Sequence, residues 1–309
     1  MSNNKYCSLI SKFDLVINGN LDEECISFCC YDYSNKPKIK LSNNAKDNVD
    51  AFFKLRDIAI NELYKNDGCM FSDCLNCSLL TSIEQQKTNL IEFVNLSFYP
   101  SPCQCNCIYC DIRKNNKMMK FDNKYLDNYY SLFDTLKFMK EKGYISPKAL
   151  WQVSCGEISI YPLKKEIIEI VKKENVIFYT NCILFDKNIA NILKNNKKAF
   201  INFSIDSGTP DTWKKVKGLN NYYKVLDNLK KYIEYSSPEQ IYLKYIILPN
   251  INNDDKNYYG LVEIMKKIKL THIILSKNYD SEDDNAEKES LKRIIKILED
   301  NNITYEFAL

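Results

Sequence analysis

Three cysteines in one short segment have the type and spacing of metal ligands. Cys103, Cys107 and Cys110 form a CxxxCxxC pattern. Thiolates are the usual protein ligands of iron–sulfur clusters, and three of them hold three irons of a cubane while leaving the fourth iron open. The spacing therefore favours a [4Fe-4S] cluster at this segment.

Two other interpretations of the segment stay open. Cys105 lies between the first two cysteines and would complete four thiolates for a structural zinc ion, although ligands crowded so closely fit a tetrahedral ion poorly. Alternatively, the cysteines carry no metal and are simply buried. Under the cluster interpretation Cys105 is not a ligand, because it lies outside the register of the other three.

A second group of cysteines lies nearer the N-terminus, and the 309 residues contain 13 cysteines in all. The first residues lack a basic region followed by an apolar run, so we expect no signal peptide and a cytoplasmic protein with reduced thiols. Cys69, Cys74 and Cys77, with Cys29 or Cys30 upstream, supply four thiolates. They form a candidate accessory site for a second iron–sulfur cluster or a zinc ion, with reduced structural cysteines as the alternative.

Small and polar residues follow several predicted strands. Gly156 and Glu157 come directly after one strand, where a glycine lets the backbone approach a ligand closely. Asn181 follows the next strand, where an Asx-type turn explains the residue at least as well as a contact with a ligand does. Ser204 and Asp206 alternate along the strand at 199–206, so we expect both on one face as contacts for a bound molecule. The alternative for Asp206 is a cap of the following helix.

Composition excludes several classes of function. The formal net charge is +3 and the lysines are dispersed, which argues against binding to nucleic acid. No stretch is apolar for long enough to span a bilayer, so we expect no membrane segment. The single histidine, His272, leaves little room for His-rich metal sites or Ser-His-Asp catalysis.

Strands and helices alternate from about residue 90 onward, which divides the chain into a Cys-rich accessory region at 1–90 and a core domain at 91–309. The predicted core strands lie at 91–97, 149–154, 176–180, 199–206, 240–248 and 272–276, and a helix follows each of them. The first of these helices, at 124–142, carries Leu132, Phe133, Leu136 and Met139 on one face.

Such alternation implies a parallel sheet with right-handed crossovers. Six strand–helix units are fewer than the eight of a closed barrel. The predicted fold class is therefore α/β, a partial (β/α)6 TIM-like barrel, with functional groups at the carboxyl ends of its strands.

These segments together resemble the radical S-adenosylmethionine (SAM) superfamily over approximately residues 91–280. The mark of that family is the CxxxCxxC pattern with an aromatic residue before the last cysteine, here Tyr109. The SCGE segment that contains Gly156 is similar to the family's GGE segment, with Cys155 in place of the first glycine. The NFSIDSGT segment that contains Asp206 is similar to the family's fourth strand.

The resemblance implies a [4Fe-4S] cluster held by Cys103, Cys107 and Cys110, with SAM bound to the open iron. It also implies SAM contacts from Tyr109, Gly156, Glu157, Ser204 and Asp206, and a contact between Lys244 and the SAM carboxylate. A flavodoxin- or ferredoxin-like donor would supply the electron that cleaves SAM reductively. The resulting 5′-deoxyadenosyl radical would take a hydrogen atom from an unknown substrate.

The resemblance assigns no catalytic residue for the substrate, and a peptide or sugar-linked metabolite is suggested only by analogy. Two rival functions remain. One is a zinc- or cluster-stabilised binding protein without catalysis. The other is a degenerate radical SAM protein that holds a cluster without cleaving SAM, an alternative that Cys155 keeps open.

Overall fold

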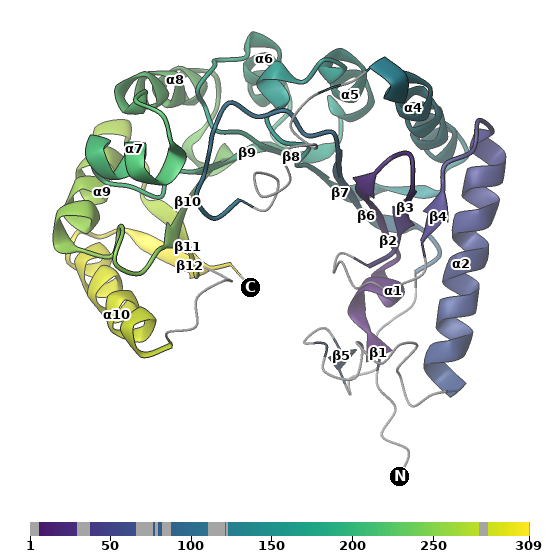
Figure 1. Ribbon diagram of the computed structural model, residues 1–309, viewed down its shortest axis with the longest axis horizontal. Coiled ribbons are helices and arrows are strands. Elements are labelled where there is room, and N and C mark those ends of the chain that lie inside the picture. The colour runs from purple at the N-terminus through teal and green to yellow at the C-terminus, as the bar shows by residue number, and fades with distance from the viewer. Residues whose placement is uncertain are drawn as a thin grey trace. The chain divides into compact units, whose positions relative to one another are not determined.

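The structure is a computed structural model of the chain (Figure 1). It describes residues 6–29, 38–65, 77, 80–81, 88–110, 121, 123–277 and 284–308. The chain divides into two compact units: unit 1 comprises residues 1–100, 121–155 and 162–176, and unit 2 comprises residues 101–120, 156–161 and 177–309.

Unit 1 is built on a sheet whose central strands are parallel. β6 (Ile91–Tyr99) pairs with β7 (Ile145–Val153) on one side and with β2 (Asp14–Asn20) on the other. β3 (Glu24–Ser27) and β4 (Ile39–Lys40) continue the β2 side as antiparallel strands. Because β2 belongs to the predicted accessory region and β6 to the predicted core, the sheet continues across residue 90. That position as a domain boundary stays a prediction.

Helices and short elements complete unit 1: α1 (Ser8–Lys12), α2 (Ala45–Lys65), η3 (Asn123–Tyr125), α4 (Leu126–Glu141) and α5 (Lys164–Val171). The four residues predicted to form the apolar face of α4 are all buried, which confirms that expectation. A separate antiparallel pair joins β1 (Tyr6–Cys7) to β5 (Leu80–Thr81).

Unit 2 continues the strand–helix alternation. β10 (Ile241–Ile247) lies in parallel between β9 (Ala199–Ser204) and β11 (His272–Lys277), and β12 (Thr304–Phe307) pairs with β11. β8 (Asn175–Tyr179) neighbours β9 and begins in unit 1. The helices are η4 (Ile158–Ile160), α6 (Lys187–Asn195), α7 (Pro210–Lys217), α8 (Tyr222–Tyr235), η5 (Pro238–Gln240), α9 (Asp255–Ile268) and α10 (Asp284–Asp300).

β9 and β10 each bury one face and leave the other half-exposed. In β10, buried and half-exposed residues alternate along the whole strand. Tyr245 on the buried face packs edge-on against Tyr258 of α9, with the ring centroids 6.2 Å apart. The opposite face carries Ser204 and Lys244, which are partners in the register of β9 and β10. This arrangement leaves polar side chains on the face that a small molecule can reach.

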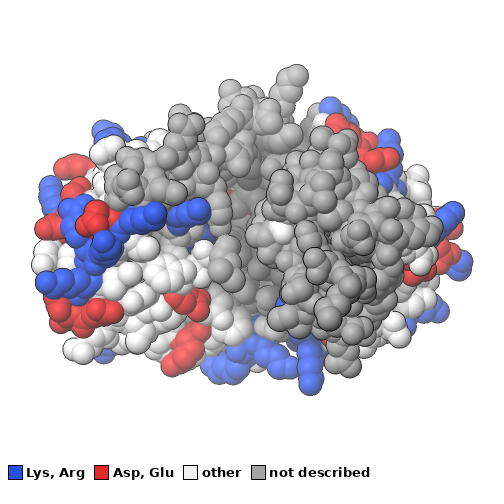
Figure 2. All heavy atoms as spheres, turned by 90° about the horizontal axis from the view of Figure 1, so that it is seen from below, with Lys and Arg blue, Asp and Glu red and all other residues white. Residues whose placement is uncertain are grey.

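The described residues show neither a long apolar helix nor, on the face in Figure 2, a surface of one charge sign. Their helices include none with enough length and apolar character to cross a membrane. On the face shown in Figure 2, lysines and arginines lie interspersed with aspartates and glutamates. Mixed charge of this kind gives no concentrated positive field for a nucleic acid on the described part of that face.

Candidate functional site

The cysteine loop, residues 101–110, belongs to unit 2. The backbone N–H of Cys110 donates to the carbonyl of Cys107 at 3.2 Å, which closes a turn between two of the predicted ligands. Cys103, Cys107 and Cys110 are half-buried, whereas Cys105 is only 5% exposed. The three predicted ligands therefore keep access to a bound group that Cys105 lacks.

The thiols of the loop differ in the direction in which the protein shifts their pKa values. Cys105 hydrogen-bonds with the sulfurs of Cys103 and Cys107, and this contact is the first cause that lowers the pKa of both. The pKa of Cys107 falls to about 6, since the Lys217 ammonium also lowers it, against the opposing effects of burial and Asp206. The pKa of Cys105 is raised by the same two hydrogen bonds and by burial. The thiolate is the form that binds a metal, so the lowered pKa values favour Cys103 and Cys107 over Cys105 as metal ligands.

The Gly156–Glu157 turn packs directly on the cysteine loop. A Cβ atom at Gly156 would lie 2.6 Å from the carbonyl carbon and oxygen of Ser101 and 2.7 Å from the carbonyl oxygen of Pro102, and its φ is +74°. The N–H of Glu157 donates to the same Pro102 oxygen at 2.9 Å. Glycine is therefore required here by backbone packing within the protein, whether or not SAM also approaches this turn.

The carboxylate of Glu157 is fully buried and satisfied by protein donors. One oxygen accepts from the Thr180 hydroxyl and the Ser159 N–H, both at 2.9 Å, and the other accepts from the Asn181 N–H at 2.6 Å. Burial raises the pKa of Glu157, and these hydrogen bonds oppose the rise. This side chain fixes the loop after β8, and its predicted contact with SAM stays a prediction.

Asn181 links the loop after β8 to the cysteine loop. Its Nδ2 donates to Gln104 Oε1 at 3.0 Å and lies 3.5 Å from the Cys103 sulfur, within hydrogen-bonding range for sulfur. Its Oδ1 accepts from the N–H of Ile183 at 3.0 Å, so the Asx-type turn considered for this position is confirmed. A donor at a ligand sulfur is a feature that tunes iron–sulfur clusters.

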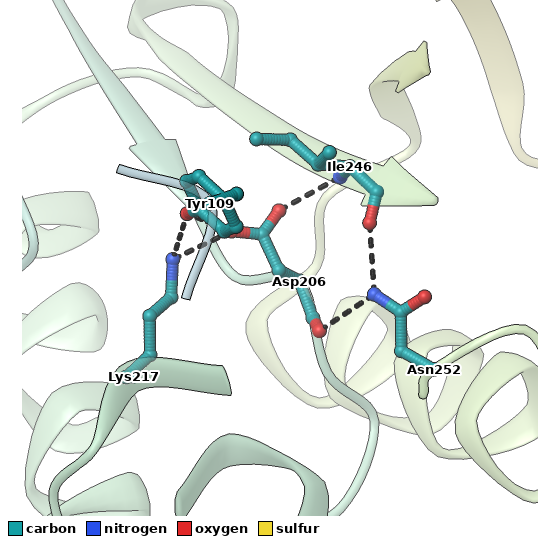
Figure 3. Close-up of polar contacts among 5 residues, drawn as sticks. All are labelled: Tyr109, Asp206, Lys217, Ile246 and Asn252. Atoms are coloured by element: carbon teal, nitrogen blue, oxygen red, sulfur yellow. Dashed lines mark hydrogen bonds and ion pairs between the residues drawn. The ribbon is translucent and has the colours of Figure 1, made fainter. Parts of the chain in front are cut away.

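A buried ionic network joins the cysteine loop to the end of β9 (Figure 3). The Tyr109 hydroxyl donates to Asp206 Oδ2 at 2.5 Å, and Lys217 Nζ donates to the same oxygen at 2.5 Å and to the Tyr109 hydroxyl at 2.6 Å. The N–H of Ile246 donates to the other carboxylate oxygen of Asp206 at 2.7 Å. Asp206 is fully buried and the Lys217 side chain is 4% exposed, so the ion pair is shielded from water.

Asp206 corrects two expectations from the sequence. β9 ends at Ser204, and Asp206 has a φ of +47°, so it does not extend the strand or share its face with Ser204 as predicted. Nor does it cap α7, because the N-cap is Thr209, whose side chain accepts from the N–H of Thr212. Asn252 supports this left-handed backbone by donating to the Asp206 carbonyl at 2.9 Å. With its carboxylate occupied by protein donors, Asp206 as a SAM contact stays a prediction.

Ser204 and Lys244 are different, because their polar groups are available. Neither side chain has a hydrogen bond or ion pair with any residue that the structure describes. The two residues are register partners on the half-exposed face of β9 and β10. Burial lowers the pKa of Lys244, and the Lys217 charge contributes to this, while Asp206 opposes it. A hydroxyl and a cation in this position are suited to bind an anionic or polar ligand.

The cysteine loop supplies thiols that suit a cubane. The thiolates of a cubane bind separate irons, so three of them can hold three of its four irons. Three half-buried thiols in one loop, two of them with lowered pKa values, have the donor chemistry of the cubane.

The accessory site falls partly outside the described residues. Cys30, Cys69 and Cys74 are not among them, whereas Cys29 and Cys77 are. Burial raises the pKa of Cys7 to about 11, and the nearby Cys29 and Cys77 thiols contribute to the rise. The structure therefore brings Cys7, which stands alone in the sequence, close to two of the predicted accessory ligands. The β1–β5 pairing, with Cys7 opposite Leu80, produces this proximity to Cys77.

Comparison with known families decides the classification. Residues 102–262, more than half of the 309-residue chain, match the family model described as the radical SAM superfamily. The chain belongs to the radical SAM superfamily. The α/β fold class with a predominantly parallel sheet, expected from the alternation of strands and helices, is confirmed.

Solved structures with TM-scores of 0.50 or above share the fold of this chain. Streptococcus suis SuiB bound to the precursor peptide SuiA is 12% identical, with a TM-score of 0.52 over 98% of this chain and 72% of that chain. SuiB bound to S-adenosylmethionine is 15% identical, with a TM-score of 0.50 over 96% and 72%. A radical SAM methyltransferase from Sphaerobacter thermophilus is 14% identical, with a TM-score of 0.49 over 67% of this chain and 63% of that chain. No curated protein sequence matches.

Proposed function

We propose that this radical SAM protein is an active enzyme that binds a [4Fe-4S] cluster through Cys103, Cys107 and Cys110. When reduced, such a cluster passes one electron to the sulfonium of SAM, which breaks a C–S bond and yields methionine and a 5′-deoxyadenosyl radical that takes a hydrogen atom from the substrate. The observation that carries the proposal is a loop of three half-buried thiols with two lowered pKa values.

The surrounding residues have two kinds of role in this proposal. Glu157 and Asn181 hold the backbone that packs against the loop, and Asn181 supplies a donor to the Cys103 sulfur. Ser204 and Lys244 present a hydroxyl and an ammonium from neighbouring strands, neither of them bonded to a side chain that the structure describes. We assign these two to the polar end of bound SAM, because the SAM methionine moiety carries a carboxylate that a lysine pairs with readily.

A peptide is the substrate class to test first. SuiB, a protein of the same fold, binds the precursor peptide SuiA. Sequence identity of 12% supports a shared fold and no more, so a sugar-linked metabolite remains the second class to test. The electron donor we propose is a flavodoxin or ferredoxin, and the compartment is the reducing cytoplasm that free thiols require.

One experiment tests the enzymatic proposal. The chain is purified and reconstituted without oxygen, its iron and sulfide are counted, and 5′-deoxyadenosine is measured after addition of SAM and dithionite. Four irons per chain, or eight with an accessory cluster, together with 5′-deoxyadenosine support the proposal. A fully loaded cluster without 5′-deoxyadenosine indicates the degenerate protein, and colourless protein with stoichiometric zinc indicates the binding protein.

A further inference from the structure

We propose that Lys217 is a positioning residue that docks the cysteine loop on the end of α7 and sets a positive charge beside it, which raises the reduction potential of the bound cluster. The inference rests on the proposed function, because the loop has to hold a cluster. It concerns a residue that neither the spacing of the cysteines nor the strand-end motifs indicate.

The first observation is that α7 ends against the cysteine loop. The carbonyls of the last helical turn lack partners inside a helix. Here the N–H of Asn106 donates to the carbonyl of Lys217 at 2.9 Å, and the N–H of Ile108 donates to the carbonyl of Val216 at 3.0 Å. These two amides flank Cys107, so the backbone on both sides of a predicted ligand is fixed by the end of α7.

The close approach depends on the residue that follows Lys217. Gly218 has a φ of +73°, and a Cβ atom there would lie 2.8 Å from the Cβ of Asn106. A left-handed glycine at a helix C-terminus is common, but here it also lets the loop backbone reach the last helical carbonyls. The docking is therefore a backbone fit that the side chain of Lys217 then secures.

The second observation is that Lys217 turns inward, unlike its neighbours. Lys214 and Lys215 on the same helix are exposed, whereas the Lys217 side chain is 4% exposed. Its ammonium bonds with Asp206 and with the hydroxyl of Tyr109, and it lies 5.1 Å from the centroid of the Tyr109 ring. Lys217 therefore contacts the loop twice. Its backbone carbonyl accepts from the N–H of Asn106, and its ammonium bonds with the hydroxyl of Tyr109.

The buried ammonium of Lys217 places a positive charge in contact with the loop. It bonds to the hydroxyl of Tyr109, a loop residue between Cys107 and Cys110, whereas the second carboxylate oxygen of its partner Asp206 accepts from the N–H of Ile246 on β10. Charges buried away from water are weakly screened, so the ammonium acts on the loop. One-electron reduction makes the cluster more negative, and nearby positive charge stabilises the reduced form. An ion pair with a purely structural role would lower stability on removal without changing this potential.

The test is an anaerobic redox titration of reconstituted protein without SAM, monitored by electron paramagnetic resonance. Wild type is compared with Lys217→Met and with the matched control Lys215→Met, each checked for iron content and folding. In Lys217→Met we expect the equilibrium constant for reduction to fall by about tenfold or more, which for one electron corresponds to a shift of about 59 mV to lower potential. Lys215→Met should titrate like wild type.

A second variant guards against misfolding caused by the unpaired Asp206. The double substitution Asp206→Asn/Lys217→Met leaves no buried charge at this position, and its potential should also lie below that of wild type, by a smaller amount. A cubane that is loaded in both variants and reduced at the wild-type potential overturns the role of Lys217 while leaving the enzymatic proposal intact. Wild-type protein that binds no cubane overturns the enzymatic proposal itself, and the role of Lys217 with it.

Discussion

The hydroxyl of Tyr109 donates to the carboxylate of Asp206 at 2.5 Å. One of these residues precedes the last cysteine of the loop, and the other lies just beyond the end of β9. The contact therefore fixes the loop relative to the strand end next to Ser204. In this chain, both the aromatic position of the cysteine motif and the aspartate after β9 serve to hold the loop in place.

Tyr109→Phe tests this relationship. The substitution keeps the ring and removes two buried hydrogen bonds, one donated to Asp206 and one accepted from Lys217, while the ion pair between Lys217 and Asp206 remains. We expect a loss of about 1–3 kcal/mol in the free energy of unfolding, measured by urea denaturation of the metal-free protein. Tyr223→Phe is the matched control, because Tyr223 is 70% exposed, and it should change stability by less than about 0.5 kcal/mol. Equal stability of the two variants would contradict a stabilising role for the Tyr109 hydroxyl.

The sequence predicts the parts of this site that follow from local pattern. Cysteine spacing identifies the loop, and helical periodicity identifies the buried face of α4, because both depend on residues close together in the chain. Lys217 gives no such signal, since a lysine in a lysine-rich turn at the end of a helix is expected to face solvent. Its burial depends on Asp206 and Tyr109, and only the tertiary fold brings these together.

Asp206 is a second residue whose placement the sequence pattern does not predict. Alternation along the sequence places it on a strand face with Ser204, but its φ of +47° takes it off the strand. That conformation is supported by Asn252, which is far along the chain and bonds both Asp206 and Ile246. A non-glycine residue with a left-handed backbone is uncommon, and no local pattern in this segment announces it.

Cys107→Ala and Cys105→Ala separate ligand from non-ligand within one loop. Removing Cys107 takes away a half-buried thiol whose pKa is about 6, so we expect loss of the SAM-cleaving cluster and of 5′-deoxyadenosine formation. Removing the buried Cys105 should leave the cluster in place, because its pKa is raised and it has little access to a bound group. Iron, sulfide and 5′-deoxyadenosine are measured in both, and SAM cleavage that survives Cys107→Ala unchanged would falsify the ligand assignment.

Gly156→Ala and Gly143→Ala distinguish steric conflict from backbone strain. The two glycines have φ values of +74° and +72°, so an added Cβ costs each about 1–2 kcal/mol in conformational energy. No atom in the described part of the chain lies within 4 Å of a Cβ at Gly143, whereas one at Gly156 would meet the Ser101 carbonyl at 2.6 Å. We therefore expect Gly156→Ala to lower the melting temperature further and to reduce iron loading, while Gly143→Ala loads normally. Matching melting temperatures and iron contents would show that the loop adapts.

Lys244→Met tests the assignment of a ligand-binding cation. The ammonium has no ion pair with the described residues, so its removal leaves none of them without an ionic partner. Loss of a charge-assisted contact with the SAM carboxylate should weaken SAM binding by about tenfold or more, measured by anaerobic calorimetry on cluster-loaded protein. The iron content should not change, and Lys214→Met on the exposed side of α7 serves as the control. An unaltered dissociation constant for SAM would rule out this contact.

Asp14 gives a prediction about pH that does not depend on any cofactor. Burial raises the pKa of this carboxyl from 3.8 to about 7, with Glu92 adding to the rise and Lys12 opposing it. Its Oδ1 has no hydrogen-bond partner among the residues that the structure describes. Because the pKa is higher in the folded protein, the stabilising contribution is complete below about pH 4 and is lost as the pH rises through about 7.

Asp14→Asn removes this pH dependence, because the amide stays neutral at every pH. The variant should match wild type near pH 4 and exceed it above pH 8 by about 4 kcal/mol in the free energy of unfolding, since the pKa rises from 3.8 to about 7 and each pKa unit corresponds to about 1.4 kcal/mol. Urea denaturation of metal-free protein across this range measures the difference. Asp134→Asn is the control for loss of a carboxylate, as that side chain is 67% exposed, and its stability should differ from that of wild type by less than about 0.5 kcal/mol. An Asp14→Asn variant whose difference from wild type is the same at every pH would show that burial leaves the ionisation of Asp14 unaffected.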